Sequence, residues 1–389
     1  MRKWSARGMV FVLASGVAAH LGCGGDEPAN GVPTDGDGGP AATFDAGPGP
    51  NPNPGTGKDG GDETEDAGPD GGPKEGARIV AYAFSNNPAA AESTPSAVYS
   101  YNASGGAMKI TRTSAGNYSV TFTGLAGLDG SVALASAYDL AGGLCHWAGT
   151  TGEEVRVRCL NAAGSNTDAK FTVTVVAKSE AAGATIVGFA HANEKASASY
   201  TPQASRSNNG VGGGAITASR SAVGTYKIEF GGVALDDIEN VQLMPYGDEG
   251  ARCVVKSWGG TTVNLHCYDV NGALADAEYA VLLAGKKPGG TAKIVSYAHA
   301  NESESASYAP TLSYNEGEGA VTASRSAAGT YAMTFDGRSL DNGAHVQVSA
   351  QSQGRRCNVQ GWAGAKVDLT CTSASGTKSD NNYAIVVLQ

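Results

Sequence analysis

Three stretches of the chain share one cysteine spacing. In each stretch, thirteen residues separate two cysteines, and a glycine stands at the midpoint. The cysteine pairs are Cys145 and Cys159, Cys253 and Cys267, and Cys357 and Cys371, and their midpoints are Gly152, Gly260 and Gly364. Glycine adopts the positive φ of a tight reversal without a Cβ clash. The spacing therefore predicts three β-hairpins, each closed at its open end by a disulfide.

The cysteine pairs belong to an internal triplication of the chain. Residues 219–230, SRSAVGTYKIEF, correspond to residues 111–122 and 324–335, at offsets of 108 and 105 residues. Each copy spans about 100 residues, which is large enough to fold alone rather than to stack as a solenoid. We therefore predict three domains, at residues 77–177, 183–284 and 290–389. The short connections between the domains predict a linear arrangement, in which each domain has limited freedom to move relative to the next.

The hydrophobic residues within a copy recur with the period of a β-strand. Tyr226, Ile228 and Phe230 alternate with Lys227 and Glu229, which is the pattern of an antiparallel strand with one buried face. Many short strands with regular turn signals are typical of a β-sandwich. The sequence predicts an all-β fold of three tandem antiparallel β-sandwiches, and both an immunoglobulin-like and a jelly-roll form remain open.

The N-terminus has the pattern of an export signal. A basic start precedes an apolar run at residues 9–19, which is too short to span a bilayer as a helix. Residues 21–23, LGC, resemble the lipobox of bacterial lipoproteins, which implies cleavage before Cys23 and a diacylglycerol on its thiol. His20 departs from the aliphatic residue usual in that family, and a plain secretory signal is the alternative. Cys23 is also the odd cysteine left over from the three pairs.

An acidic segment follows the export signal. Residues 24–76 contain twelve acidic side chains, two lysines and nine of the fifteen prolines. With few apolar residues the segment cannot offset its ordering entropy, so we predict a disordered linker. This segment accounts for most of the acidity, because the whole chain has a formal charge of -10. The repeats are close to neutral and offer no basic surface, which argues against a nucleic-acid partner.

The hairpin tryptophans are the candidate ligand residues. Strict alternation from Cys253 places Trp258 on the outward face of its hairpin, and Trp362 falls on the same face of the third hairpin. An exposed tryptophan near a hairpin tip is a candidate platform for a sugar ring. The alternative is a β-bulge, which shifts the alternation and turns the ring into the core. Trp147 of the first copy falls on the inward side and favours that alternative.

Two further sets of residues recur among the copies. His191 and His299 end the first strands of their copies, and Phe84 stands there in the first copy. A position that accepts phenylalanine is more typical of structure than of catalysis.

Arginines recur just before the glycine of another hairpin, at Arg112, Arg220 and Arg325. They could form a row of anion sites. The sequence favours a structural role instead, in which each arginine ends a strand and donates hydrogen bonds to carbonyl groups of the turn.

Motifs for metal binding and catalysis are missing from the sequence. The cysteine pairs lack the short chelating loops of zinc sites. Nucleophile, phosphate-loop and dinucleotide-binding motifs do not occur either. We therefore predict no catalytic residues, no metal and no cofactor, and a chain that is not an enzyme.

The repeated motifs resemble tandem repeats of about 100 residues found in secreted proteins of soil and predatory bacteria. The shared elements are Tyr-Ala-x-Ala-Asn, Tyr-x-Pro, Thr/Ser-Arg-x-x-x-Gly-x-Tyr-x-x-x-Phe, and then Cys, Trp-Gly and a second Cys. The resemblance covers residues 77–389. This family has no assigned activity, so the resemblance supplies no functional residues.

The sequence predicts an exported, lipid-anchored protein at the cell surface. Gly24 after the lipobox cysteine favours the outer membrane. The predicted function is binding or adhesion, with a glycan or a cell-surface protein as the partner and the membrane reached through the N-terminal lipid. The alternative is a structural spacer or coat component of the envelope without a specific ligand.

Overall fold

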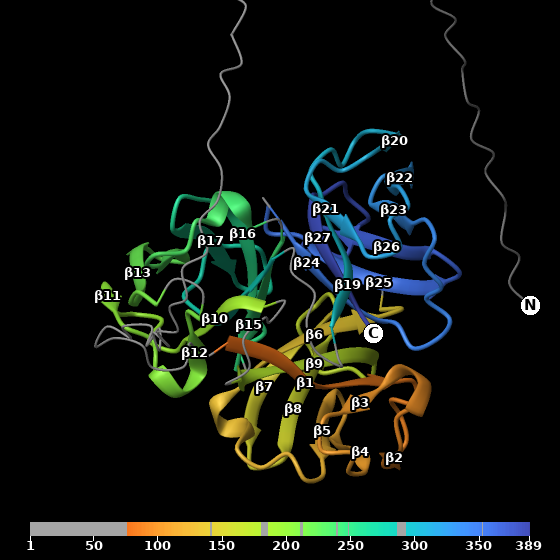
Figure 1. Cartoon of the computed structure of the whole chain (residues 1–389), viewed down its shortest axis with the longest axis horizontal. Helices are drawn as coiled ribbons and strands as arrows, with labels where there is room; N and C mark the ends of the chain where they lie inside the picture. Colours follow the sequence, from red (N-terminus) through yellow and green to blue (C-terminus); the bar gives the residue numbers. More distant parts are fainter. Residues whose placement is uncertain are drawn as a thin grey trace, which may run out of the picture. The chain divides into compact units, whose positions relative to one another are not determined.

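The computed structural model describes residues 76–140, 142–179, 186–210, 213–238, 240–247, 249–285, 293–351 and 353–389. The predicted all-β class is confirmed, because every regular element in these ranges is a strand or a short 3-10 helix (Figure 1). A helix long and apolar enough to cross a bilayer does not occur among the described residues. The predicted signal peptide, Cys23 and linker lie outside the described residues, except that Gly76 begins β1.

The first repeat contains nine strands in two sheets. They are β1 (Gly76–Ser85), β2 (Glu92–Ser93), β3 (Tyr101–Asn102), β4 (Met108–Ser114), β5 (Asn117–Phe122), β6 (Val132–Tyr138), β7 (Leu144–Thr151), β8 (Glu154–Leu160) and β9 (Lys170–Ser179). One sheet has the order β3-β1-β9-β6. The other has the order β2-β4-β5-β8-β7.

The second repeat has the same two sheets. Its strands are β10 (Ile186–Ala192), β11 (Ser199–Tyr200), β12 (Ser207–Asn208), β13 (Ile216–Ala222), β14 (Thr225–Phe230), β15 (Asn240–Tyr246), β16 (Arg252–Gly259), β17 (Thr262–Tyr268) and β18 (Glu278–Ala284). The four-stranded sheet has the order β12-β10-β18-β15, and the five-stranded sheet the order β11-β13-β14-β17-β16.

The third repeat follows the same plan. Its strands are β19 (Ile294–Ala300), β20 (Ser307–Tyr308), β21 (Ser313–Asn315), β22 (Val321–Ala327), β23 (Thr330–Phe335), β24 (His345–Ala350), β25 (Arg356–Ala363), β26 (Lys366–Thr372) and β27 (Tyr383–Leu388). Its sheets are β21-β19-β27-β24 and β20-β22-β23-β26-β25.

Alternation along the strands builds the cores. In β14, Tyr226, Ile228 and Phe230 are buried and Lys227 is exposed, as the sequence predicts. The three buried side chains pack in one cluster with Val263 and residues of both sheets of the second repeat. The period of two therefore gives each strand one face for the core.

The three predicted disulfides are confirmed. They join Cys145 to Cys159, Cys253 to Cys267 and Cys357 to Cys371, with a Cα–Cα distance of 4.0 Å in each pair. The midpoint glycines have the positive φ that the turn requires, at +60°, +57° and +56° for Gly152, Gly260 and Gly364. Such bonds persist in oxidising surroundings, so they indicate an extracytoplasmic location.

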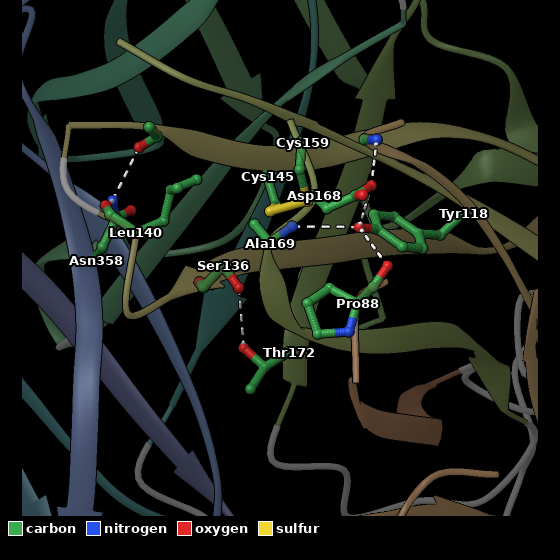
Figure 2. Close-up of a disulfide and its surroundings, with 12 residues drawn as sticks. Pro88, Tyr118, Ser136, Leu140, Cys145, Cys159, Asp168, Ala169, Thr172 and Asn358 are labelled. Carbon is green, nitrogen blue, oxygen red and sulfur yellow. Dashed lines mark hydrogen bonds between the residues drawn. A yellow bond between two sulfur atoms is a disulfide. The ribbon is translucent and has the colours of Figure 1, made fainter. Parts of the chain in front are cut away.

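Buried hydrogen bonds run between the repeats. Ser136 on β6 donates to Gln347 on β24 at 2.7 Å, and Ser349 on β24 donates to Gln242 on β15 at 2.8 Å. In a partly buried bond, Asn358 donates to Leu140 O at 2.8 Å, and Figure 2 shows the two residues side by side. Buried polar groups are costly to leave unpaired, so these bonds favour one arrangement of the repeats.

The described residues all belong to one compact unit. Besides the side-chain bonds, single bridges pair β1 with β10, β7 with β15 and β6 with β25. Through these contacts each repeat touches both others. The structure thus differs from the predicted linear arrangement of domains. The reason is that polar side chains of β6, β15 and β24 form hydrogen bonds with residues of another repeat.

Candidate ligand pocket between the second and third repeats

The recurring arginines pair with an aspartate of their own repeat. Nε and Nη2 of Arg220 donate to the two carboxylate oxygens of Asp276, each at 2.8 Å. Oδ1 of Asp276 also accepts from Gly224 N at 2.9 Å and from the Tyr226 hydroxyl at 3.0 Å. The bond from Arg220 is the main reason that the pKa of Asp276 falls to about 2. Arg220 and Asp276 therefore stabilise the hairpin turn, and the carboxylate of Asp276 balances the charge of Arg220.

The same cluster occurs in the other two repeats. Asp168 accepts from Arg112, Gly116 N and Tyr118, and Figure 2 shows Tyr118 beside this carboxylate. The third cluster consists of Asp380, Arg325, Gly329 and Tyr331. The sequence analysis missed the three aspartates. Their signal is a fixed spacing, because each stands three residues before the first aromatic residue of the last strand of its repeat.

We expect Asp276→Ala to lower the free energy of unfolding by about 2 kcal/mol, because several hydrogen bonds to a charged group are lost and solvent partly screens them. Urea unfolding of the full chain measures this. Asp368→Ala is the control, since within the described ranges the Asp368 side chain makes only an exposed ion pair with Lys366. Equal changes in the two variants would contradict the assigned role of the cluster.

A β-bulge sets the direction of the hairpin tryptophans. Lys256 is an extra residue in the pairing of β16 with β17, so Trp258 lies opposite the core residue Val263. The pairing of β25 with β26 shifts in the same way and places Trp362 opposite Val367. Both rings are half-buried. The structure therefore shows the bulge alternative and not the exposure that strict alternation predicts, while the role of both rings as a ligand platform stays a prediction.

A tryptophan of each disulfide hairpin packs against the first strand of another repeat. The centroid distances are 5.1 Å from Trp147 to His191, 4.8 Å from Trp258 to His299 and 5.5 Å from Trp362 to Phe84. The two histidines and Phe84 thus share one structural role, as the sequence favours. We call these three contacts the first, second and third corners.

Aromatic side chains of the neighbouring repeat cover two of the corners. At the first corner, Tyr246 packs against Trp147 at 4.5 Å, and Arg206 lies 5.7 Å from the centre of that ring. At the third corner, Tyr138 and Tyr99 pack against Trp362 at 5.4 and 5.9 Å. Trp147 is therefore fully buried, while Trp362 is half-buried and packs against both tyrosine rings.

The second corner contains an open pocket. Gln351 stands where the other corners have Tyr246 and Tyr138, as the equivalent cross-repeat bridges show. The pocket has a volume of about 470 Å³, within the range of roughly 300–1,000 Å³ usual for small-molecule sites. Its lining consists of Leu235, Asp236, Ile238, Lys256, Ser257, Trp258, His299, Leu312, Gln351 and Asn382. Sequence analysis missed Gln351, although its contrast with the tyrosines of the other copies was a visible signal.

Two buried polar atoms at this pocket have no hydrogen-bond partner among the residues that the structure describes. They are Nδ1 of His299 and Nε2 of Gln351. Burial lowers the pKa of His299 to about 4, against a smaller opposing effect of Gln351, so the imidazole is neutral at pH 7. Trp258 is held in place by the bond from its Nε1 to Ile238 O at 2.9 Å. The pocket therefore offers a fixed aromatic ring beside uncharged polar groups.

The described ranges contain no group of three or more His, Cys, Asp or Glu residues able to hold a metal ion. No protein-family model matches the chain, and no curated protein or solved structure matches it either. The function is therefore inferred from the chemistry of the site itself.

Proposed function

We propose that this protein is a lipid-anchored binding module displayed on the cell envelope, held in the outer membrane through Cys23, and that the pocket of the second corner binds its ligand. The observation that carries the proposal is the open volume of about 470 Å³ beside Trp258, whereas the tryptophans at the other two corners pack against tyrosines of a neighbouring repeat. Binding without catalysis agrees with a site built from a tryptophan, amides and a neutral histidine.

The chemistry of the pocket favours an uncharged ligand rich in hydroxyl groups, which is a glycan. The face of Trp258 supplies an apolar platform for a sugar ring. Gln351 and His299 are neighbouring polar side chains of the lining that can pair with ligand hydroxyls. The rim carries one charge of each sign, Asp236 and Lys256, so it favours neither an anionic nor a cationic ligand.

A structural spacer of the envelope is the second candidate. The observation in its favour is that the first and third corners are covered by the protein's own side chains. In this function the second corner would be a gap in the packing, without a ligand.

The variant Gln351→Tyr separates the two functions, because it places in the pocket the residue type found at the other corners. We expect the variant to be more stable by about 1 kcal/mol, as cavity-filling changes commonly are, and to lose glycan binding. The measurements are thermal unfolding and binding of the full chain to a glycan array. Val223→Ala, an exposed change elsewhere in the second repeat, is the control and should retain binding.

Binding that survives Gln351→Tyr would overturn the assignment of the pocket, and absence of any glycan binding by the wild-type chain would favour the spacer. The anchor is tested separately. In cells fed a labelled fatty acid, the wild-type protein should acquire the label and Cys23→Ser should not.

A further inference from the structure

A second cavity lies where all three repeats meet. Its volume is about 60 Å³, and equivalent residues of the three repeats line it, including Cys145, Cys253 and Cys357. By this measure a water needs roughly 10–15 Å³, so the space suits a few waters or one small polyatomic ion. It is separate from the pocket at the second corner, since the two share no lining residue.

Among the described residues, the charged ones that line this cavity are all arginines. They are Arg252, Arg355 and Arg356, and no aspartate or glutamate of the described ranges lines it. Arg252 and Arg356 are only 3% and 4% exposed. The equivalent residue of the first repeat is Leu144, one position before its cysteine. Burial of a guanidinium without a counter-charge is costly, so this concentration of positive charge requires an explanation.

The two buried guanidinium groups have unused donors. Nη1 of Arg252 donates to Val270 O at 3.3 Å. Nη1 of Arg356 donates to Gly142 O, and also to Ala162 O at 3.5 Å. Nε and Nη2 of both arginines are buried and have no hydrogen-bond partner within the described part of the chain. Four N–H-bearing nitrogens are therefore free for a ligand that accepts hydrogen bonds.

Turns from the three repeats lie close to these arginines. Val270 and Ala162, whose carbonyls accept from them, also approach glycines of neighbouring turns. A Cβ added to the glycine would lie 2.7 Å from the side chain in the pair Gly164 and Val270, 3.2 Å in Gly272 and Ala374, and 2.9 Å in Gly376 and Ala162. Nη2 of Arg252 lies at this packing of turns, 3.3 Å from the Cβ position of Gly272, and the charge of Arg252 is felt by Arg356 of the third repeat.

Both arginines remain charged at neutral pH. Burial, with the nearby charge of Arg252, lowers the pKa of Arg356 only to about 10. Burial also lowers the pKa of Arg252, against an opposing effect of Asp269. Oδ1 of Asp269 already accepts from Asn271 N and Ala273 N, each at 2.9 Å. The nearby carboxylate is thus engaged in its own turn and forms no ion pair with Arg252.

We propose that Arg252 and Arg356 bind one small oxyanion of the phosphate or sulfate type in the cavity between the three repeats. Arginine presents planar donors that match such oxygens, and the anion would supply the counter-charge that the described lining residues lack. Because the arginines belong to different repeats, the bound anion holds those repeats together. The same chemistry could come from a free ion or from the end of a phosphate monoester, and the small volume favours the free ion.

The test is thermal unfolding and calorimetric titration of the full chain with inorganic phosphate, sulfate and glycerol 1-phosphate, in chloride buffers of matched ionic strength. We expect a saturable rise in Tm and a single binding site for phosphate or sulfate. The variant Arg252→Leu/Arg356→Leu, which copies Leu144 of the first repeat, should lose at least tenfold in affinity. Arg78→Leu removes an exposed arginine of β1 and should leave binding unchanged.

Equal binding by the wild-type protein and the double variant would overturn the proposal, and so would a rise in Tm that never saturates. Binding of glycerol 1-phosphate as tight as that of phosphate would support the site and identify an esterified anion as a source. A measurement on the wild-type chain avoids any folding defect of the variants. Crystals soaked in selenate should show anomalous density between the two guanidinium groups, and its absence would contradict the proposal.

Discussion

Trp147→Ala is expected to lower the free energy of unfolding of the full chain by about 3–5 kcal/mol, the usual cost of removing a large buried aromatic side chain. Trp147 is completely buried. Its Nε1 donates to Thr150 Oγ1 at 2.9 Å, and its ring contacts His191 and Tyr246 of the second repeat. The substitution therefore opens a cavity in the first repeat and removes the first corner at the same time. Denaturant unfolding followed by circular dichroism measures the loss.

The control for this prediction is Val98→Ala, because Val98 is 53% exposed. That change should stay within about 0.5 kcal/mol of the wild-type protein. If Trp147→Ala costs no more than this control, the first corner does not hold the repeats together.

Removal of one disulfide by Cys253→Ala/Cys267→Ala is expected to cost about 3 kcal/mol, because the bond closes a loop of roughly 15 residues and restricts the unfolded chain. The guanidinium midpoint of the oxidised variant, compared with that of the wild-type protein, measures this cost. Both cysteines are buried, and alanine leaves no polar group in their place.

Reduction supplies the matching control for the disulfide. The wild-type protein in reductant should lose more stability than the double variant does without it, since three bonds are broken instead of one. A double variant as stable as the wild-type protein would show that the hairpin folds without its disulfide.

The features that the sequence predicts correctly are local. Gly260 lies midway between Cys253 and Cys267, so the turn, the hairpin and the disulfide follow from one short stretch. The alternation of Tyr226, Ile228 and Phe230 likewise identifies a buried face without knowledge of the other strands. Hairpin geometry and strand period depend on residues that lie close together along the chain, so a short stretch of sequence is enough to predict them.

The features that sequence analysis missed depend on distant residues. The extra residue at Lys256 has no marker in the sequence, yet it turns Trp258 toward the core. His299 contacts that ring from another repeat, and Gln351 leaves the pocket open because a smaller side chain replaces a tyrosine. Asp276 was missed because its partner Arg220 lies 56 residues away in the chain.

The contacts between repeats are central to this account, because both the second-corner pocket and the oxyanion cavity require the repeats to stay together. Differential scanning calorimetry of the oxidised full chain tests them most directly. We predict one cooperative transition for the three repeats, with equal calorimetric and van't Hoff enthalpies. Three separate transitions, or a calorimetric enthalpy several times the van't Hoff value, would mean that the repeats unfold independently and would contradict the account.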